Sequence, residues 1–249
     1  MPGAAKGVTG NLNIIERHLQ ESAREYVYRL LKVNIINMTL PPGQGISEQE
    51  IAERLRLSRT PVREAFIKLA QEKLLDIYPQ KGTYISLIDT SQVEESKFVR
   101  ETLEKEVIQQ ACVAFPGEEL FQLQSSLALQ ELCLSEKNYH KFFELDETLH
   151  ATIFKGCRKA RTWSMLQQMN AHYNRVRMLN LAVGYDWDQL LHQHKELVRA
   201  IREKDKTLAR RTIDTHLNKV VLDLEYLRGK YPHYFLPLAP AAANGTETK

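Results

Sequence analysis

Four polar side chains in the C-terminal half of the sequence have the types and positions expected of a metal site. Asp146 and His150 lie four residues apart, on the apolar face of one predicted helix. His194 and His216 each lie within the apolar stripe of a later predicted helix. One carboxylate and three imidazoles that met in a helix bundle would suit a divalent transition metal. The alternative for each histidine is a hydrogen-bonded core residue, and helical periodicity alone does not show that the helices converge.

Such a cluster is compatible with three functions, which are the binding of a ligand that the protein senses, metal-assisted catalysis, and sensing of the metal alone. A metal ion with open coordination positions activates water, so a metalloenzyme is one alternative. Hydrolysis would also need a general base beside the metal, and the sequence shows no obvious additional inward-facing Asp or Glu. A protein that senses the metal alone is the other alternative. The sequence therefore favours a binding protein that is not an enzyme.

A second group of chemically useful residues lies near residue 60. The stretch Ser58-Arg59-Thr60-Pro61-Val62-Arg63 opens a predicted helix, and its two arginines are four residues apart, hence on one helical face. Arginine donates bidentately to guanine O6 and N7, whereas Ser and Thr hydroxyls at a helix N-terminus suit phosphate. A basic run alone is more often a solvated face. Its place at the start of a helix, after a short helix and a tight turn, favours contact with DNA.

The elements around this stretch have the pattern of a winged helix-turn-helix. The expected elements, in chain order, are a helix whose apolar stripe begins at Leu19, a helix opened by the capping box Ser47-Glu48-Gln49-Glu50, a helix from about Ser58 to Lys73, and strands at 75–78 and 83–88. The last two strands enclose the turn Pro79-Gln80-Lys81-Gly82. We therefore predict a DNA-binding domain at residues 12–88. In the metalloenzyme alternative, this DNA-binding domain would be residual.

The rest of the chain is predicted to be helical. Apolar periodicity continues from residue 90 to about residue 230, with breaks near Pro116-Gly117, Gly156 and Gly184 and without a convincing strand. Six or seven helices of this kind indicate an all-α bundle at residues 92–230. The expected fold is thus mainly α, with an N-terminal winged helix-turn-helix and a C-terminal helical bundle.

Composition narrows the class of protein without naming a function. The 249 residues carry a net charge of +3, which is too small to indicate nucleic-acid binding by itself. No apolar run approaches the roughly 18 residues that span a bilayer, and the N-terminus lacks the apolar core of a secretion signal. Three cysteines fit neither a disulfide framework nor a zinc motif. We therefore expect a cytoplasmic protein that does not contact a membrane.

The N-terminal pattern resembles a known family. The stretch LPPGQGISEQEIAERLRLSRTPVREAFIKLAQEKLLDIYPQKGTYIS is similar to the DNA-binding domain of GntR-family bacterial transcription regulators, in its LPPGQ turn, SRTPVREA helix and KG wing tip. The resemblance implies a homodimer that binds a palindromic operator through the major groove. It implies DNA contacts from Ser58, Arg59, Thr60 and Arg63 of the recognition helix, from Lys81 and Gly82 at the minor groove, and from Gln49 at the DNA backbone.

One residue departs from the family pattern. Arg56 stands at the turn between the second and third helices, where the family usually has glycine. If this position needs a positive φ, a residue other than glycine costs on the order of 1 kcal/mol. An additional guanidinium near a phosphate would offset that cost.

The C-terminal half resembles the FCD-type ligand-binding domain of the FadR subgroup of this family. That type carries an Asp-xxx-His pair followed by two further histidines on later helices. The resemblance implies that Zn, Ni or Mn is held by Asp146, His150, His194 and His216, with coordination positions left open. Family members commonly sense small organic acids, whose carboxylate can occupy those positions.

Two arginines are candidate clamps for such a carboxylate, because a guanidinium binds a carboxylate bidentately. Arg100 matches the FCD pattern Arg-xx-Leu-Glu, and Arg177 follows Tyr173 by one turn of a predicted inward-facing helix. Tyr173 and Asn180 are further candidates for the pocket wall. The sequence thus predicts a transcription regulator whose operator affinity changes when a metal-chelated acid binds, with residues 89–91 as the linker that reorients the winged domains.

Overall fold

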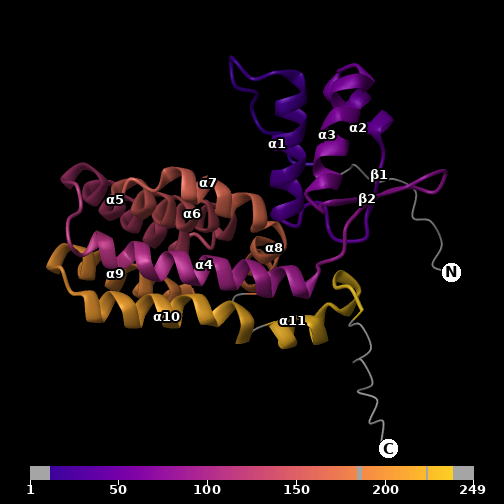
Figure 1. Ribbon diagram of the computed structural model, residues 1–249. Coiled ribbons are helices and arrows are strands. Elements are labelled where there is room, and N and C mark those ends of the chain that lie inside the picture. The colour runs from indigo at the N-terminus through magenta and orange to yellow at the C-terminus, as the bar shows by residue number, and fades with distance from the viewer. Residues whose placement is uncertain (1–11, 184–186, 223, 238–249) are drawn as a thin grey trace, which may run out of the picture.

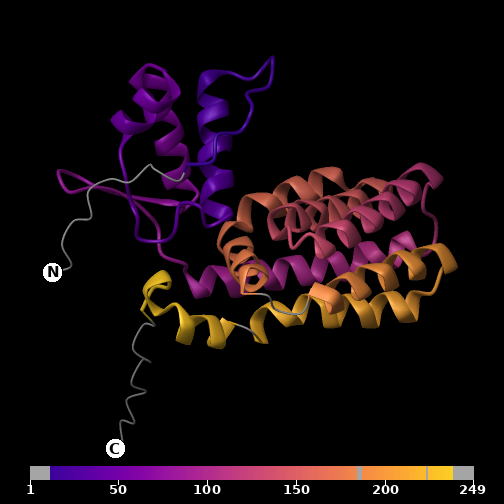
Figure 2. The ribbon, with the colours of Figure 1, turned by 180° about the vertical axis from the view of Figure 1, so that it is seen from behind.

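The computed structural model describes residues 12–183, 187–222 and 224–237, which form two parts joined after the last strand (Figures 1 and 2). The first part contains α1 (Ala23–Ile36), β1 (Gly45–Ile46), α2 (Glu48–Leu55), α3 (Arg59–Gln71), β2 (Leu75–Tyr78) and β3 (Gly82–Ile85). The second part is helical throughout the described residues. The predicted fold class, mainly α with an N-terminal winged helix-turn-helix and a helical bundle, is confirmed.

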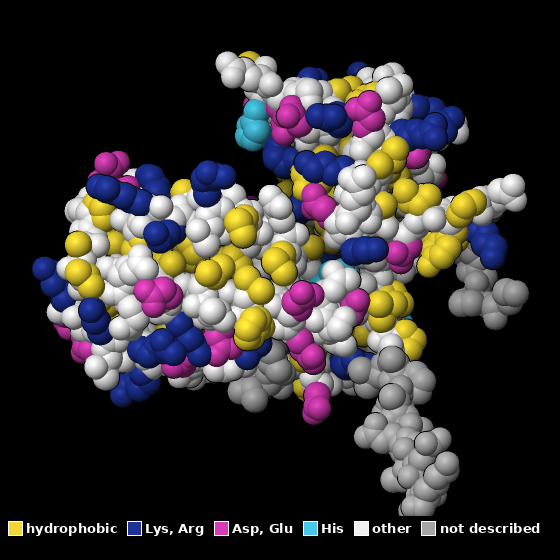
Figure 3. All heavy atoms as spheres, in the orientation of Figure 1, with side chains coloured by type: hydrophobic (Ala, Val, Ile, Leu, Met, Phe, Trp, Pro, Cys, Tyr) yellow, Lys and Arg dark blue, Asp and Glu magenta, His cyan; other side chains and the backbone are white. Residues whose placement is uncertain are grey.

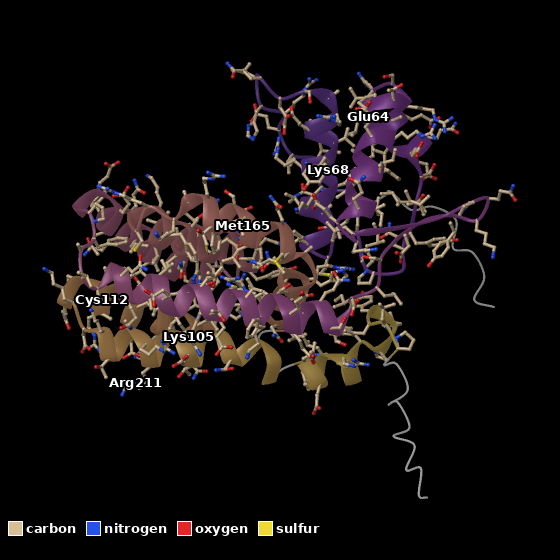
Figure 4. All side chains as sticks on the ribbon, in the orientation of Figure 1. Glu64, Lys68, Lys105, Cys112, Met165 and Arg211 are labelled. Atoms are coloured by element: carbon tan, nitrogen blue, oxygen red, sulfur yellow. The ribbon has the colours of Figure 1, made fainter. Side chains whose placement is uncertain are left out.

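Helices α1 and α3 form the core of the winged domain. Their apolar faces meet in one fully buried cluster, which includes Val27, Leu30, Leu31, Val62, Phe66 and Leu69. The antiparallel sheet has the strand order β1-β3-β2, and the β2–β3 hairpin projects away from the helices as the wing (Figure 1). Lys68 of α3, labelled in Figure 4, lies 3.8 Å above the ring of Tyr28 in α1. This packing buries Val62 and leaves Arg59, Thr60 and Arg63 of α3 exposed on the surface.

Several boundaries in the winged domain differ from the sequence prediction. Helix α1 begins after Ser22, and Leu19 is fully exposed outside the helix. The reason is a capping box that was not predicted from the sequence, in which Ser22 N donates to Glu25 Oε2 at 3.0 Å and Glu25 N donates to Ser22 Oγ at 3.2 Å. Ser47 does precede α2, but its side chain forms no capping hydrogen bond. Strand β3 ends at Ile85 rather than at residue 88, and β1 was not predicted.

The bundle follows the winged domain without a further strand among the described residues. Its helices are α4 (Thr90–Ala111), α5 (Gly117–Ser135), α6 (Tyr139–Gly156), α7 (Ala160–Met169), α8 (Ala171–Ala182), α9 (Trp187–Glu203), α10 (Lys206–Leu222) and α11 (Leu224–Lys230), before a 3-10 turn at Pro232–Tyr234. Helix α4 runs along the bundle between the α5–α7 layer and the α9–α10 layer (Figure 1). Of the later helices that carry a predicted ligand, α6 and α10 pack against α4, whereas α9 packs against α5 and α10.

Breaks between these helices were predicted in part. Those at Pro116-Gly117 and Gly156 are confirmed, whereas the one near Gly184 lies outside the described residues. Further breaks at residues 136–138 and at Asn170 have no glycine or proline to signal them. Lys137 takes the left-handed conformation, with φ of 55°, that glycine usually occupies.

Helix α8 joins the two domains, and both ribbon views place it at the junction (Figures 1 and 2). The Nδ1 atom of His172 accepts a hydrogen bond from Asp89 N at 3.1 Å, and its Nε2 atom donates to Lys73 O at 3.1 Å. The fully buried Arg175 donates to Ser86 O at 2.6 Å. One helix of the bundle therefore holds both the end of α3 and the segment that leads out of the wing.

The C-terminal segment closes the same junction from another side. Ile88 N donates to Tyr234 O at 2.8 Å, and Leu236 N donates to Ile88 O at 2.9 Å. Phe235 lies between these two bonds in a parallel bridge with Ile88 and is buried. Arg228 of α11 donates to Thr90 Oγ1 at 3.2 Å. The linker is therefore held on both sides.

Replacing Arg56 tests the strain at the turn between α2 and α3. Arg56 has φ of 54°, which favours glycine. Arg56→Gly should raise the free energy of unfolding by about 0.5–1 kcal/mol in urea denaturation. The control is Arg54→Gly, within the last turn of α2, which also removes one positive charge. It should lower the free energy of unfolding by about 1 kcal/mol, because glycine is unfavourable inside a helix. A loss of stability in Arg56→Gly would contradict this account.

His172 should make the stability of the protein depend on pH. Burial, with the positive charge of Arg175, lowers the pKa of His172 from 6.5 to about 4. The folded protein keeps this imidazole neutral while the unfolded chain protonates it, so its contribution is present above pH 6.5 and is lost as the pH falls toward 4. His172→Gln keeps an acceptor and a donor but does not titrate.

The variant should therefore lose less stability than the wild type as the pH falls from 6.5 to 4. The expected difference reaches about 3 kcal/mol, from denaturant titrations at several pH values. Parallel pH curves for the two proteins would show that His172 does not act in this way.

Candidate metal centre

The four residues predicted to bind a metal meet in the interior of the bundle. They are Asp146 and His150 of α6, His194 of α9 and His216 of α10. Each offers one ligand atom, and these atoms all lie within 4.8 Å of one another. The Nε2 atoms of His150 and His216 are 3.1 Å apart, and Asp146 Oδ1 lies 3.1 Å from His194 Nε2. The side chains are 0–6% exposed. Convergence, which periodicity does not show, is thus present in the structure.

Each imidazole is held at its Nδ1 atom by a buried acceptor outside the centre. His150 Nδ1 lies 2.6 Å from Glu104 Oε2, His194 Nδ1 lies 2.7 Å from Gln130 Oε1, and His216 Nδ1 lies 3.1 Å from Gln193 Oε1. Because carboxylate and amide oxygens only accept hydrogen bonds, each Nδ1 carries the proton. A neutral ring held in this way directs the lone pair of its Nε2 atom at the common centre, as in histidines that ligate a metal.

The atoms that face the centre fit a cation. Asp146 Oδ1 and His194 Nε2 are buried and have no hydrogen-bond partner, although they lie close together. Burial lowers the pKa of His194 and of His216, so these rings stay neutral instead of taking up a proton. Three imidazole nitrogens and one carboxylate oxygen are a donor set for a divalent transition metal. A cation would supply the partner that these atoms lack.

Glu104 corrects one expectation from the sequence. No inward-facing acid besides Asp146 was expected, but Glu104 of α4 is 3% exposed and accepts hydrogen bonds from His150 and from Arg100. Burial alone would raise the pKa of Glu104, but the charge of Arg100 outweighs it and holds that pKa well below its usual range. Glu104 is thus an acceptor that positions His150, on the side of the ring away from the centre.

Sequence reasoning also missed Gln130 and Gln193. A single buried glutamine on a helix carries no distinct pattern, so neither residue gave a signal. Glu104 did have one, because it is the last residue of the Arg-xx-Leu-Glu pattern that identified Arg100.

Two of the residues predicted to bind an acid stand directly beside this centre. Arg177 of α8 donates to Asp146 and to Glu147. Arg100 of α4 donates to Glu147 at 3.3 Å, and its Nη2 atom is buried without a hydrogen-bond partner. The ring of Tyr173 packs against both guanidinium groups, at 5.4 Å from Arg100 and 5.9 Å from Arg177. The structure therefore gathers three of the four predicted acid-binding residues.

Asn180 is the fourth, and it lies nearly two turns beyond Tyr173 on α8. Its Oδ1 atom is buried and has no hydrogen-bond partner. Among the contacts of the described residues, none joins Asn180 to the four predicted ligands or to the two arginines. Its role in the pocket stays a prediction.

The residues predicted to contact DNA lie on the outer surface of the winged domain. All are exposed, namely Gln49 of α2, the N-cap residue Ser58, Arg59, Thr60 and Arg63 of α3, and Lys81 and Gly82 at the tip of the wing. Gly82 has φ of 112°, which favours glycine at this turn. Lys and Arg side chains gather beside α2 and α3 and at the wing (Figure 3). The surface matches the prediction, but contact with DNA stays a prediction.

Known families match both parts of the chain. Residues 23–85 match the family described as bacterial regulatory proteins, gntR family, and residues 97–219 match the FCD domain. An HTH-type transcriptional regulator in an unstable DNA locus of Streptomyces ambofaciens is 31% identical over 212 residues, which cover 85% of this chain and 89% of that protein. The chain belongs to the GntR family. This GntR regulator is therefore a DNA-binding transcription regulator with an FCD domain.

Other relatives support the assignment. The HTH-type transcriptional repressor RspR of Escherichia coli K12 is 29% identical over 215 residues, covering 86% of this chain and 94% of that protein. The solved structure of E. coli McbR/YncC shares the fold, with a TM-score of 0.74, 19% identity and coverage of 84% of this chain and 99% of that chain. The solved structure of a GntR transcriptional regulator from Rhodococcus sp. RHA1 also shares the fold, with a TM-score of 0.70 and 19% identity. The match covers 82% of this chain and 99% of that chain. Within the described part of this GntR regulator, no helix is long and apolar enough to cross a membrane.

Replacing Gln130 tests the role of the outer acceptors. Gln130→Ala removes the group that fixes the ring of His194, so we expect about 10–100-fold weaker zinc binding in competition with a chromogenic chelator. Gln124→Ala, an exposed position of the same helix α5, should bind zinc as the wild type does. Equal affinities of Gln130→Ala and the wild type would show that Gln130 does not position His194 for the ion.

Proposed function

We propose that this GntR regulator binds a palindromic operator as a homodimer and changes its operator affinity when its FCD domain binds a divalent transition metal and a small organic acid. Residues 12–88 would bind DNA, and residues 92–230 would bind the metal and the acid and form the dimer. The observation that carries the proposal is the cluster of four buried ligand atoms beside two arginines, in a chain that also exposes a recognition helix.

In the DNA-binding part, the exposed start of α3 would enter the major groove. Arg59 and Arg63 would read guanine edges, and the Ser58 and Thr60 hydroxyls would bind phosphates at the helix N-terminus. The wing would lie at the minor groove, and the backbone contact would come from α2. The residues for these last contacts are Lys81, Gly82 and Gln49.

In the sensing part, Asp146 and the three histidines would hold Zn, Ni or Mn. When bound, the ion would supply open coordination positions for a carboxylate. Arg100 and Arg177 would pair with the acid through their guanidinium groups. The ring of Tyr173 supports both, and Asn180 would line the far end of the pocket.

Helix α8 offers the connection between the two parts. It carries Tyr173 and Arg177 toward the metal centre and His172 and Arg175 toward the winged domain. A ligand changes operator affinity only if it binds one arrangement of the domains better than another. A shift of α8 on binding would change how residues 86–89 are held. We propose repression that the acid relieves, since the relative from E. coli K12 is named a repressor.

Fluorescence anisotropy with selected operator DNA tests this function. The wild-type protein would first select duplexes from random DNA, and its Kd would then be measured with Zn²⁺, with a panel of small carboxylates, and with both. We expect both together to weaken binding about tenfold or more, and Asp146→Ala to lose this response. A response to Zn²⁺ alone would indicate the metal sensor instead. An unchanged Kd in every condition would contradict the proposal.

Separate substitutions distinguish base reading from backbone contact. Arg63→Ala should cost about 1–3 kcal/mol of operator binding and reduce discrimination against a changed guanine. Lys81→Ala should weaken binding to all sequences alike and lower the salt dependence by about one counterion. Arg161→Ala, an exposed arginine of α7, is the control and should leave Kd unchanged. Equal discrimination in Arg63→Ala and the wild type would contradict base reading by Arg63.

A further inference from the structure

A pocket of about 490 Å³ lies between the winged domain and the bundle. One wall comes from α1, with Val33 and Ile36, and the opposite wall comes from α6 and α7, with Phe143 and Trp163. This volume lies in the range of small-molecule sites, which are mostly apolar with a few polar groups. The pocket is therefore large enough to receive a ligand that touches both domains.

The polar floor of this pocket is in direct contact with the predicted acid-binding arginines. Trp163 stacks on His150, with ring centroids 6.4 Å apart and planes at 7°, and it also lies 5.5 Å from the Arg100 guanidinium. Asn174 accepts a hydrogen bond from Arg177 at 3.0 Å. The pocket and the metal centre are thus separated by a single layer of side chains.

Glu147 is the residue of that layer that pairs with both arginines. Its Oε1 atom accepts from both Arg100 and Arg177, and its Oε2 atom accepts from Gln167 at 2.7 Å. It lines the pocket, and its side chain is 16% exposed. The carboxylate of Glu147 therefore pairs with both guanidinium groups on the side that faces the pocket. A ligand that enters from the pocket would meet this carboxylate first.

We infer that Glu147 is an internal competitor of the ligand: its carboxylate holds Arg100 and Arg177 until a ligand carboxylate enters from the interdomain pocket and displaces it. The inference rests on the proposed acid-sensing function. The walls of the pocket define the ligand further, as a carboxylate carried on an apolar body. That body would lie against α1, so the ligand would contact the DNA-binding domain directly.

The test measures carboxylate binding to the zinc-loaded full-length protein by titration calorimetry. The probes are acetate and 3-phenylpropionate, with 3-phenylpropionamide as the uncharged reference. Glu147→Gln removes the competing charge, so both carboxylates should bind about tenfold tighter or better, while the amide should not gain. Glu144→Gln is the matched control, because Glu144 lines the same pocket on the same helix but pairs with Lys141 instead of the arginines. It should change affinity less than about twofold.

A second pair of variants tests the same inference from other directions. Gln167→Ala removes the hydrogen bond that holds Oε2, and should tighten carboxylate binding by a smaller factor; it decides the question if Glu147→Gln does not fold. Val33→Trp fills the pocket from α1, and should weaken 3-phenylpropionate more than acetate. Zinc content is measured for every variant, so that a lost ion is not mistaken for a lost ligand site.

The outcomes separate this inference from the function on which it rests. Tighter binding in Glu147→Gln and Gln167→Ala, but not in Glu144→Gln, supports the inference. Wild-type binding that Glu147→Gln leaves unchanged or weakens would overturn it, as would equal gains in Glu144→Gln and Glu147→Gln. Failure of both carboxylates to bind either the wild type or Glu147→Gln would instead contradict the acid-sensing function itself.

Discussion

The structure depends on one constraint, the burial of three imidazole Nε2 atoms and one carboxylate oxygen at a single point. Buried polar atoms need partners, and buried charges need opposite charges. The surrounding residues meet the second requirement as a chain of alternating groups, which runs Asp146, Arg177, Glu147, Arg100, Glu104, His150. The three carboxylates and two guanidinium groups of this chain sum to one net negative charge. A divalent cation at the centre would reverse that sign and attract an anionic ligand.

This chain of charges also explains why distant elements are held together. Helix α4 contributes Arg100 and Glu104, and α6 contributes Asp146 and Glu147. Helix α8 then joins this cluster to the winged domain through residues on its other side. A rearrangement at the guanidinium groups is therefore mechanically connected to the end of α3 and to the linker. Buried networks of this kind have few alternative arrangements, which suits a switch between discrete states.

Some of this organisation was predictable from the sequence, because it repeats at helical spacing. Asp146 and His150 are one turn apart among apolar residues, and His194 and His216 interrupt apolar stripes, so their inward direction follows from periodicity. Their convergence does not, since it depends on how separate helices pack. The glutamines behind His194 and His216 were missed because a buried glutamine looks like a surface one in a sequence.

Some helix boundaries that were predicted from the sequence are wrong for a related reason. Ser22 and Ser47 are both followed three residues later by a glutamate, and only the first pair forms the reciprocal hydrogen bonds of a capping box. The left-handed residue at the turn after α5 is Lys137, where glycine would have marked the break. The choice between equal local signals is made by tertiary packing.

The most direct test of the central claim is X-ray absorption spectroscopy of the zinc-loaded full-length protein together with its zinc content. This account predicts one zinc per chain with three imidazole nitrogens and a carboxylate oxygen as protein ligands, whereas sulfur ligands, fewer than three imidazoles or no bound zinc would contradict it.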